Sequence, residues 1–465
     1  MAGFALLFPV WSVQFPPLLD YPNHLASGFV LGHLHDPAYQ FGRYYAGDWR
    51  PYPYIASDFL LMMMCRVLPA QFVGKLLLSL GVLAFPLSAW FFLRRANPGE
   101  NALALWTLLA AHNVFFLYGF LGFFFSLSVM FVSAGLWLRW LERPSVWRWA
   151  AACSAVTAAY LMHFFGFAFI ALIVALYSVS RPRWREWLYS AGMFLPGMLF
   201  YFIFSRAASQ QTSDVVFNTL DDKLESFWKI MQSHSTRLDQ ATLAAVVVLF
   251  IAGWVRNREF RWNGRWCLVA AGLLVTYAAL PVGFGAGWDI DIRVLPLLFV
   301  ALFATVRMGR RAWWLAPLAL ILFIARTVEL TQHFRSDQPK LQGMARAFAL
   351  TPQNARVLPI VASHDEDPIE QDYPHFWAYG VIERGWFSPY LSTLPRLLPL
   401  RMTADVYAPD GFWDLTYAEP PDWEQVRDNY DYVWAYDVPQ FHSALSKISE
   451  RVYASGKLEL YRIRK

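Results

Sequence analysis

Long apolar runs separated by short polar connections dominate the first two thirds of the chain. Runs long enough to cross the roughly 30 Å hydrocarbon core of a bilayer recur about eleven times. The pattern predicts an all-α polytopic membrane domain over residues 1–329. The runs lie near residues 2–18, 72–93, 101–118, 120–139, 147–163, 164–180, 187–205, 241–256, 266–281, 290–307 and 312–328.

The first outer loop is expected over residues 19–71 and contains a further apolar segment at 55–68. This segment is short for a crossing, so we interpret it as an interfacial or re-entrant helix. The run before the loop lacks a basic n-region and a small-residue cleavage motif, so we expect it to be retained as the first span. A start upstream of Met1 stays open.

Five connections between the runs are densely basic, and they alternate with connections that contain almost no Lys or Arg. Because Lys and Arg collect in cytoplasmic loops, the N-terminus is predicted to be cytoplasmic and the end of the chain extracytoplasmic. Residues 19–71, 206–240 and 330–465 then face the outer side, where we expect the chemistry. The basic groups are Arg94 and Arg95; Arg139, Arg143 and Arg148; Arg181, Arg183 and Arg185; Arg256, Arg258, Arg261 and Arg265; and Arg307, Arg310 and Arg311.

The last part of the chain, residues 330–465, mixes two kinds of pattern. Strand-like pieces occur at 357–362, 432–435 and 458–462. Helical patterns occur at 339–350, 422–429 and 439–453. The mixture predicts an extracytoplasmic α/β domain after the membrane domain.

The composition agrees with a membrane protein and excludes several other classes. Hydrophobic residues make up 57% of the chain and charged residues only 16%, against about 25% charged residues in soluble proteins. The net charge of +5 follows from basic cytoplasmic loops, so no nucleic-acid partner is inferred. The three cysteines show no disulfide or zinc spacing. P-loop, dinucleotide and HExxH motifs are missing from the sequence, which disfavours cytosolic nucleotide chemistry.

The most informative polar stretch is LLDYPNHL, Leu18 to Leu25, directly after the first span. Pro22 biases the residue before it away from helix, and Asp20 is thereby held at the membrane surface. One interpretation is that Asp20 caps a helix beginning near Asn23 or is a solvated loop residue. The other is that it is a catalytic carboxylate facing the outer side.

Other polar residues follow Asp20 in the first outer loop or fall near the outer ends of later spans, where ionisable groups are costly and usually line a cavity. Each taken singly could instead be a snorkelling or hydrogen-bonded structural group. A divalent cation bound by Asp20, Asp36 and Asp289 or Asp291 stays open, because carboxylates suit hard cations. The candidates are His24, Asp36, His112, Asn113, His163, Arg206, Asp289, Asp291 and Arg293.

These features together resemble the GT-C fold glycosyltransferases, and in particular bacterial members with a DYPNHL motif after the first span. The similar segments are Asp20–Leu25, Asn113–Phe120, His163 and Asp291–Arg293, with His375–Gly385 and Tyr430–Trp434 in the tail. The chain departs from these relatives in lacking a positively charged leader. It also lacks a WWDYG-like string, which disfavours transfer of a whole oligosaccharide to Asn.

The resemblance implies a bacterial inner-membrane enzyme that takes sugars from a polyprenyl-phosphate donor. The acceptor would be a glycan, lipid or protein on the outer face, and transfer would invert the anomeric centre. Asp20 corresponds to the catalytic acidic position of the first loop, and Arg293 or Arg206 would contact phosphate, with Asp291 orienting the guanidinium. His24, Asp36, His112, Asn113, His163 and Asp289 would line the cavity. No cofactor is expected to be required.

Two other functions fit part of the pattern. A transporter or flippase of lipid-linked sugars would also place ionisable residues inside a helical bundle. A non-catalytic scaffold for surface-polymer assembly would keep the fold without needing Asp20. The long polar first loop and the large tail favour the transferase.

Overall fold

A helix lies in each apolar run that the hydrophobic pattern predicts to cross the membrane. The computed structural model describes residues 2–208, 215–285, 287–362, 373–392, 398–409 and 420–465. The mostly helical character is confirmed, whereas the number of crossings stays a prediction. Within the described ranges, four helices are long and apolar enough to span a bilayer. They are α4 (Ala70–Ala96), α7 (Leu121–Glu142), α13 (Thr236–Arg256) and α16 (Ala316–Ala345).

The first helix, α1 (Ala2–Trp11), is shorter than the predicted span over 2–18. Pro16 and Pro17 follow it closely, and proline lacks the N–H that a continuing helix needs. The chain from residue 12 to residue 20 is therefore irregular. The segment predicted as an interfacial helix forms α3 (Ile55–Cys65), whose 11 residues are fewer than a crossing requires.

Two compact units interleave along the chain instead of dividing at residues 329/330. Unit 1 comprises Met1–Pro9, Pro51–Ala56 and Leu78–Thr331, and unit 2 comprises Val10–Arg50, Ser57–Leu77 and Gln332–Lys465. Most of the first outer loop thus belongs to the same unit as the C-terminal domain. We describe each unit by itself.

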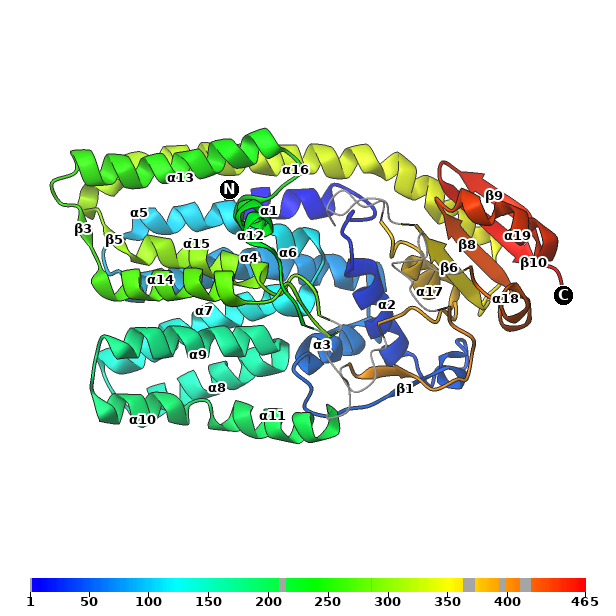
Figure 1. Ribbon diagram of the computed structural model, residues 1–465, viewed down its shortest axis with the longest axis horizontal. Coiled ribbons are helices and arrows are strands. Elements are labelled where there is room, and N and C mark those ends of the chain that lie inside the picture. The colour runs from blue at the N-terminus through cyan, green and yellow to red at the C-terminus, as the bar shows by residue number, and fades with distance from the viewer. Residues whose placement is uncertain (1, 209–214, 286, 363–372, 393–397, 410–419) are drawn as a thin grey trace. The chain divides into compact units, whose positions relative to one another are not determined.

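Unit 1 is a bundle of helices joined by short turns (Figure 1). The turns contain the local signals that end one helix and start the next. Ser145 caps α8 by accepting the N–H of Arg148, and His163 lies in extended conformation between α8 and α9. The other helices of the bundle are α5 (Asn101–Ala104), α6 (Val114–Leu117), α8 (Val146–Met162), α9 (Phe164–Val179), α10 (Trp184–Gly192), α11 (Leu195–Ala208), α12 (Leu220–Ser226), α14 (Gly264–Ala279) and α15 (Leu295–Ala304).

The five basic connections lie together at one end of unit 1 (Figure 1). Two-residue strands β3 (Arg261–Trp262) and β5 (Val306–Arg307) pair with each other and join two of these connections. Side-chain contacts link the connection at Arg94 and Arg95 to two others: Arg95 Nη1 lies 3.2 Å from Glu142 Oε2, and the N–H of Gly309 donates to Glu100 Oε1 at 2.8 Å. The helices that follow the second and third basic connections, α8 and α10, are also in contact, because Trp149 Nε1 donates to the carbonyl of Tyr189 at 2.9 Å. Helices α8 and α15 connect this end to the turns that contain His163 and Arg293.

Unit 2 contains a four-stranded mixed sheet with the order β6-β8-β10-β9. Strands β6 (Val357–Val361) and β8 (Tyr432–Tyr436) are parallel and fully buried, with Val357 opposite Tyr432. Strand β10 (Leu458–Ile463) runs antiparallel to β8 and to β9 (Ser449–Ser455). The three predicted strands are therefore present, and the C-terminal region contains a sheet as expected. Helices α17 (Ala378–Arg384), α18 (Trp423–Asn429) and α19 (His442–Ile448) accompany it.

The helical prediction for residues 439–453 is wrong in its second half. Helix α19 ends at Ile448, and the following residues form the edge strand β9. Pairing with β10 decides this conformation, and an ion pair between Arg451 and Glu459 crosses the two strands. A contact between distant residues thus outweighs the local helical pattern.

Helix α2 (Tyr21–Gly32) begins just after Asp20 and packs against α17 and α3 within unit 2. The approach to α3 is close, because a Cβ placed on Gly28 would lie 2.4 Å from Cβ of Leu61. The first outer loop also pairs with the C-terminal region through β1 (Tyr45–Gly47) and β7 (Leu400–Met402). These contacts fix the N-terminus of α2 relative to the turn before α17.

Candidate functional site

Asp20 occupies the N-cap position of α2, but its side chain does not cap the helix. Oδ1 of Asp20 instead lies 2.8 Å from Nε2 of His375, in the turn before α17. The Asp20 side chain keeps 29% of its surface exposed, whereas that of His375 keeps 5%. The capping interpretation therefore does not account for this carboxylate, which pairs with His375 and stays partly exposed.

Asn23 lies one helical turn after Asp20 on α2 and contacts the other nitrogen of the His375 ring. Its Nδ2 lies 3.3 Å from Nδ1 of His375 and 3.2 Å from the carbonyl oxygen of Tyr390. Its Oδ1 accepts the N–H of Ser392 at 2.9 Å. Asp20, Asn23 and His375 thus form a continuous polar cluster in unit 2, which we call the Asp20 cluster.

Two other residues predicted for the first outer loop belong to the same unit. His24 follows Asp20 by one helical turn and is partly buried. Burial lowers the pKa of its imidazole, although the Asp20 carboxylate opposes this shift. Asp36 accepts the N–H of Ala38 at 2.9 Å, which stabilises the turn after α2. His24 therefore lies beside the Asp20 cluster, and Asp36 acts in a turn.

His375 was not predicted as a site residue. It opens the string His375–Gly385, which carried only a family resemblance, and nothing in its spacing points to Asp20. The packing of α17 against α2 creates the pair. Sequence alone provides no signal for a contact between such distant positions.

Arg293 is the centre of a second cluster, in unit 1, and is buried there. Nη1 lies 3.1 Å from Nε2 of His163, and Nη2 donates to the carbonyl of Trp288 at 3.0 Å. The guanidinium carbon also lies 5.2–5.3 Å from the ring centroids of Phe120, Phe123 and Phe165. Two predicted cavity residues, Arg293 and His163, are therefore in contact.

His163 faces two obligate donors in this cluster. Its Nδ1 lies 3.1 Å from the backbone N–H of Phe165, and its Nε2 faces the Arg293 guanidinium. A neutral imidazole can accept at one nitrogen only. A neutral His163 therefore accepts a hydrogen bond from only one of these two groups at a time.

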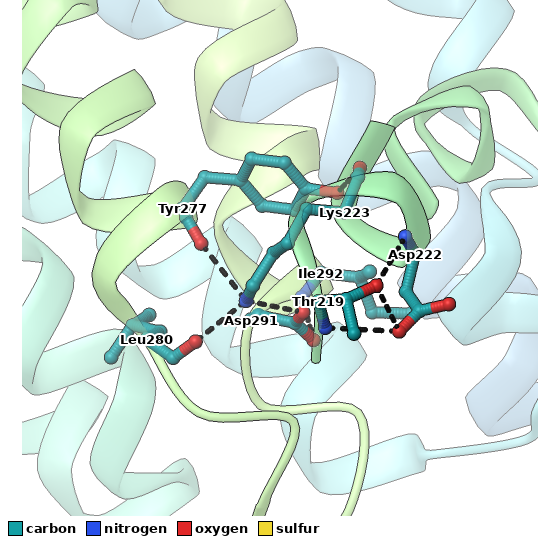
Figure 2. Close-up of polar contacts among 7 residues, drawn as sticks. All are labelled: Thr219, Asp222, Lys223, Tyr277, Leu280, Asp291 and Ile292. Atoms are coloured by element: carbon teal, nitrogen blue, oxygen red, sulfur yellow. Dashed lines mark hydrogen bonds and ion pairs between the residues drawn. The ribbon is translucent and has the colours of Figure 1, made fainter. Parts of the chain in front are cut away.

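Asp291 pairs with Lys223, a residue that the sequence analysis did not single out (Figure 2). Nζ of Lys223 lies 2.7 Å from Oδ2 of Asp291 and also donates to the carbonyls of Tyr277 at 3.2 Å and Leu280 at 2.6 Å. Oδ1 of Asp291 accepts the N–H of Ile292 at 2.9 Å. Asp291 thus anchors the turn that contains Arg293. Its side-chain hydrogen bonds, as the structure describes them, are formed with Lys223 and with the backbone of Ile292.

The remaining candidates have structural contacts or fall outside the description. Nε2 of His112 lies 3.0 Å from the carbonyl oxygen of Leu6, and Asn113 caps α6 by accepting the N–H of Phe115. Asp289 has a left-handed backbone with φ of 56°. Arg206 lies in α11, but its side chain is outside the described residues. Among the described residues, no group of three or more His, Cys, Asp or Glu side chains is arranged to bind a metal ion.

Comparisons with known proteins bear on the fold. Neither the protein-family models nor the curated proteins contain a match to this chain. Among solved structures, the chain is similar to the apo crystal structure of ArnT from Cupriavidus metallidurans, a GT-C glycosyltransferase. The two share 11% sequence identity with a TM-score of 0.59, over 98% of this chain and 96% of ArnT. The chain therefore shares the GT-C fold with ArnT over nearly its whole length.

Proposed function

We propose that this protein is a membrane glycosyltransferase that moves a sugar from a polyprenyl-phosphate donor to a hydroxyl of a glycan, lipid or protein. The GT-C fold shared with ArnT supports the class of enzyme. The single observation that supports the chemistry is the pairing of the Asp20 carboxylate with the buried His375 side chain. In this pair the Asp20 carboxylate keeps part of its surface exposed. A positioned and reachable carboxylate is what a general base requires.

In the proposed reaction, the acceptor oxygen attacks the anomeric carbon of the donor sugar. The bond between that carbon and the phosphate oxygen breaks, and its electron pair leaves with the lipid phosphate. The hydroxyl proton passes to Asp20 as the new carbon–oxygen bond forms. A single displacement inverts the anomeric centre, so no second carboxylate nucleophile is needed.

Arg293 is the proposed contact for the donor phosphate. Its guanidinium offers a planar set of donors that matches phosphate oxygens and stays charged. Lys223 and Asp291 hold the adjacent turn, so the guanidinium is positioned before substrate arrives. Stabilising the charge that develops on the leaving phosphate lowers the barrier without a strong general acid.

The test is sugar transfer by the purified protein in lipid nanodiscs with a panel of radiolabelled polyprenyl-phosphate sugars and a mixed acceptor fraction. We expect Asp20→Asn to lower kcat by at least about 100-fold, the usual contribution of a general base. The matched control is Asp428→Asn, because Asp428 is 67% exposed on α18 and lies outside the Asp20 cluster.

Three outcomes decide the proposal. Transfer by wild type and control, with loss in Asp20→Asn, supports it. Equal transfer by all three proteins would show that Asp20 is not the base. If wild type transfers no sugar from any donor but moves lipid-linked sugars across vesicles, the protein is a transporter and the proposal fails.

A further inference from the structure

Two backbone groups set the orientation of the Asn23 side chain. The N–H of Ser392 can only donate, and it lies 2.9 Å from Oδ1 of Asn23. The carbonyl of Tyr390 can only accept, and it lies 3.2 Å from Nδ2. Because an amide oxygen accepts and an amide nitrogen donates, these contacts are compatible with one orientation of the amide only.

The position of the proton on His375 follows from that orientation. Nδ2 of Asn23 also lies 3.3 Å from Nδ1 of His375, and because Nδ2 can only donate, Nδ1 has to accept. A neutral imidazole that accepts at Nδ1 has its proton on Nε2. This N–H faces Oδ1 of Asp20 at 2.8 Å. The alternative tautomer would oppose two N–H groups at Asn23 and turn a lone pair toward the carboxylate.

Burial makes these bonds hard for water to replace. Asn23 keeps 3% of its surface exposed and the His375 side chain 5%. A buried donor or acceptor without a partner is costly, so the native arrangement strongly disfavours the other amide orientation and the other tautomer. Only Asp20, the outer member of the cluster, is substantially accessible.

We infer that Asn23 and His375 are positioning residues, which hold the Asp20 carboxylate toward the acceptor by keeping the imidazole proton on Nε2. The inference rests on the proposed role of Asp20 as the base. His375 donates one hydrogen bond to the carboxylate and so fixes its rotamer. Asn23 acts one step further away, by fixing the tautomer of His375.

The first test needs no substrate. Nitrogen-15 NMR of histidine-labelled protein in lipid nanodiscs reports which imidazole nitrogen is protonated. The chain contains 10 histidines, and the His375 signal is the one lost in His375→Gln. We expect wild type to show a protonated Nε2 and a bare Nδ1. In Asn23→Asp, a carboxylate would face Nδ1, so Nδ1 should become protonated.

If His375→Gln does not fold, the Asn23→Asp spectrum identifies the signal, because one imidazole alone should change its protonation. The matched control is Asn354→Asp. Asn354 also accepts a backbone N–H, that of Gln40, and donates to a backbone carbonyl, that of Ala38, but it lies on an exposed part of unit 2. A protonated Nδ1 in wild type, or an unchanged spectrum in Asn23→Asp, would overturn the inference.

The second test measures transfer kinetics. His375→Phe removes the donor to Asp20, and we expect kcat to fall about 10- to 100-fold while KM for the donor changes little. His375→Gln, which keeps an N–H donor, should recover part of kcat. A purely structural role would predict loss of folded protein in both variants and no recovery by Gln.

The two tests separate this inference from the proposed function. A protonated Nε2 in wild type combined with no sugar transfer from any donor would contradict the transferase while leaving the tautomer assignment correct. Transfer that depends on Asp20 but is unaffected by His375→Phe would keep the transferase and overturn the positioning role.

Discussion

Lys223 and Asp291 illustrate how a buried ion pair determines local structure at the level of single residues. Their side chains keep 6% and 1% of their surface exposed, so both charged groups are desolvated in the folded protein. Desolvation costs several kcal/mol per ion, and the pair therefore contributes little net stability by itself. Its effect is to fix the turn before Arg293, because the ammonium also binds the carbonyls of Tyr277 and Leu280 (Figure 2).

We predict that Lys223→Met destabilises the protein by about 3–5 kcal/mol, because it leaves the Asp291 carboxylate buried without its cation. Thermal unfolding in nanodiscs measures the effect. The double variant Lys223→Met with Asp291→Asn should be more stable than Lys223→Met alone, since Asn is neutral and still accepts the N–H of Ile292. Additive losses in the double variant would contradict this account.

At the level of elements, Asp431 joins the starts of the parallel strands β6 and β8. Its Oδ2 accepts the backbone N–H of Arg356 at 2.9 Å, and its Oδ1 lies 3.0 Å from Nη2 of the same residue. Burial raises the pKa of Asp431, but hydrogen bonds from Arg356 and Lys465 outweigh this and lower the pKa to about 2. The folded protein therefore binds this proton less readily than the unfolded chain does.

The sign of the pH effect follows from linkage. The pKa of an Asp in an unfolded chain is about 3.9, so the stabilisation is complete above that value and is lost as the pH falls toward about 2. We expect Asp431→Asn to cost about 1 kcal/mol near neutral pH, because the carboxylate is 31% exposed and partly screened. The difference in Tm between wild type and variant should shrink below about pH 4. A constant difference at all pH values would argue against this role.

The elements could be predicted where local pattern decides the conformation. Apolar runs of bilayer length become helices because a helix satisfies its own backbone groups, and the buried strands β6 and β8 follow their apolar, β-branched and aromatic residues. Strand β9 was missed because its conformation depends on pairing with β10. Helix α1 ends early because the predicted span over 2–18 includes Pro16 and Pro17, which do not support a continuing helix.

For the whole molecule, the candidate site was predictable only in part. Asp20 is indicated by its position directly after the first span, whereas His163 and Arg293 are indicated because ionisable residues at membrane depth are energetically costly. Lys223 and His375 were not predicted as site residues. A lysine in a polar loop is usually a solvated surface residue, and a histidine in an aromatic-rich segment is usually a packing residue. Their partners lie far away in the chain, and only tertiary packing brings them into contact.

The orientation of the molecule in the membrane is the remaining prediction at this scale. The five basic connections gather at one end of unit 1, and the positive-inside rule assigns that end to the cytoplasm. We expect alkaline phosphatase, which needs the oxidising periplasm to form its disulfides, to be inactive when fused after Arg143 or Arg183. Fusions after His234 or Lys465 should be active.

A fluorescent protein that matures only in the cytoplasm provides the matched control and should give the opposite result at each of the four positions. Reversed activities would place the turns with His163 and Arg293 on the cytoplasmic side. The proposed transferase takes its lipid-linked donor on the outer face, so Arg293 could not then contact the donor phosphate there. The orientation experiment therefore tests the assignment of Arg293 as well as the topology, without requiring the identity of the sugar or the acceptor.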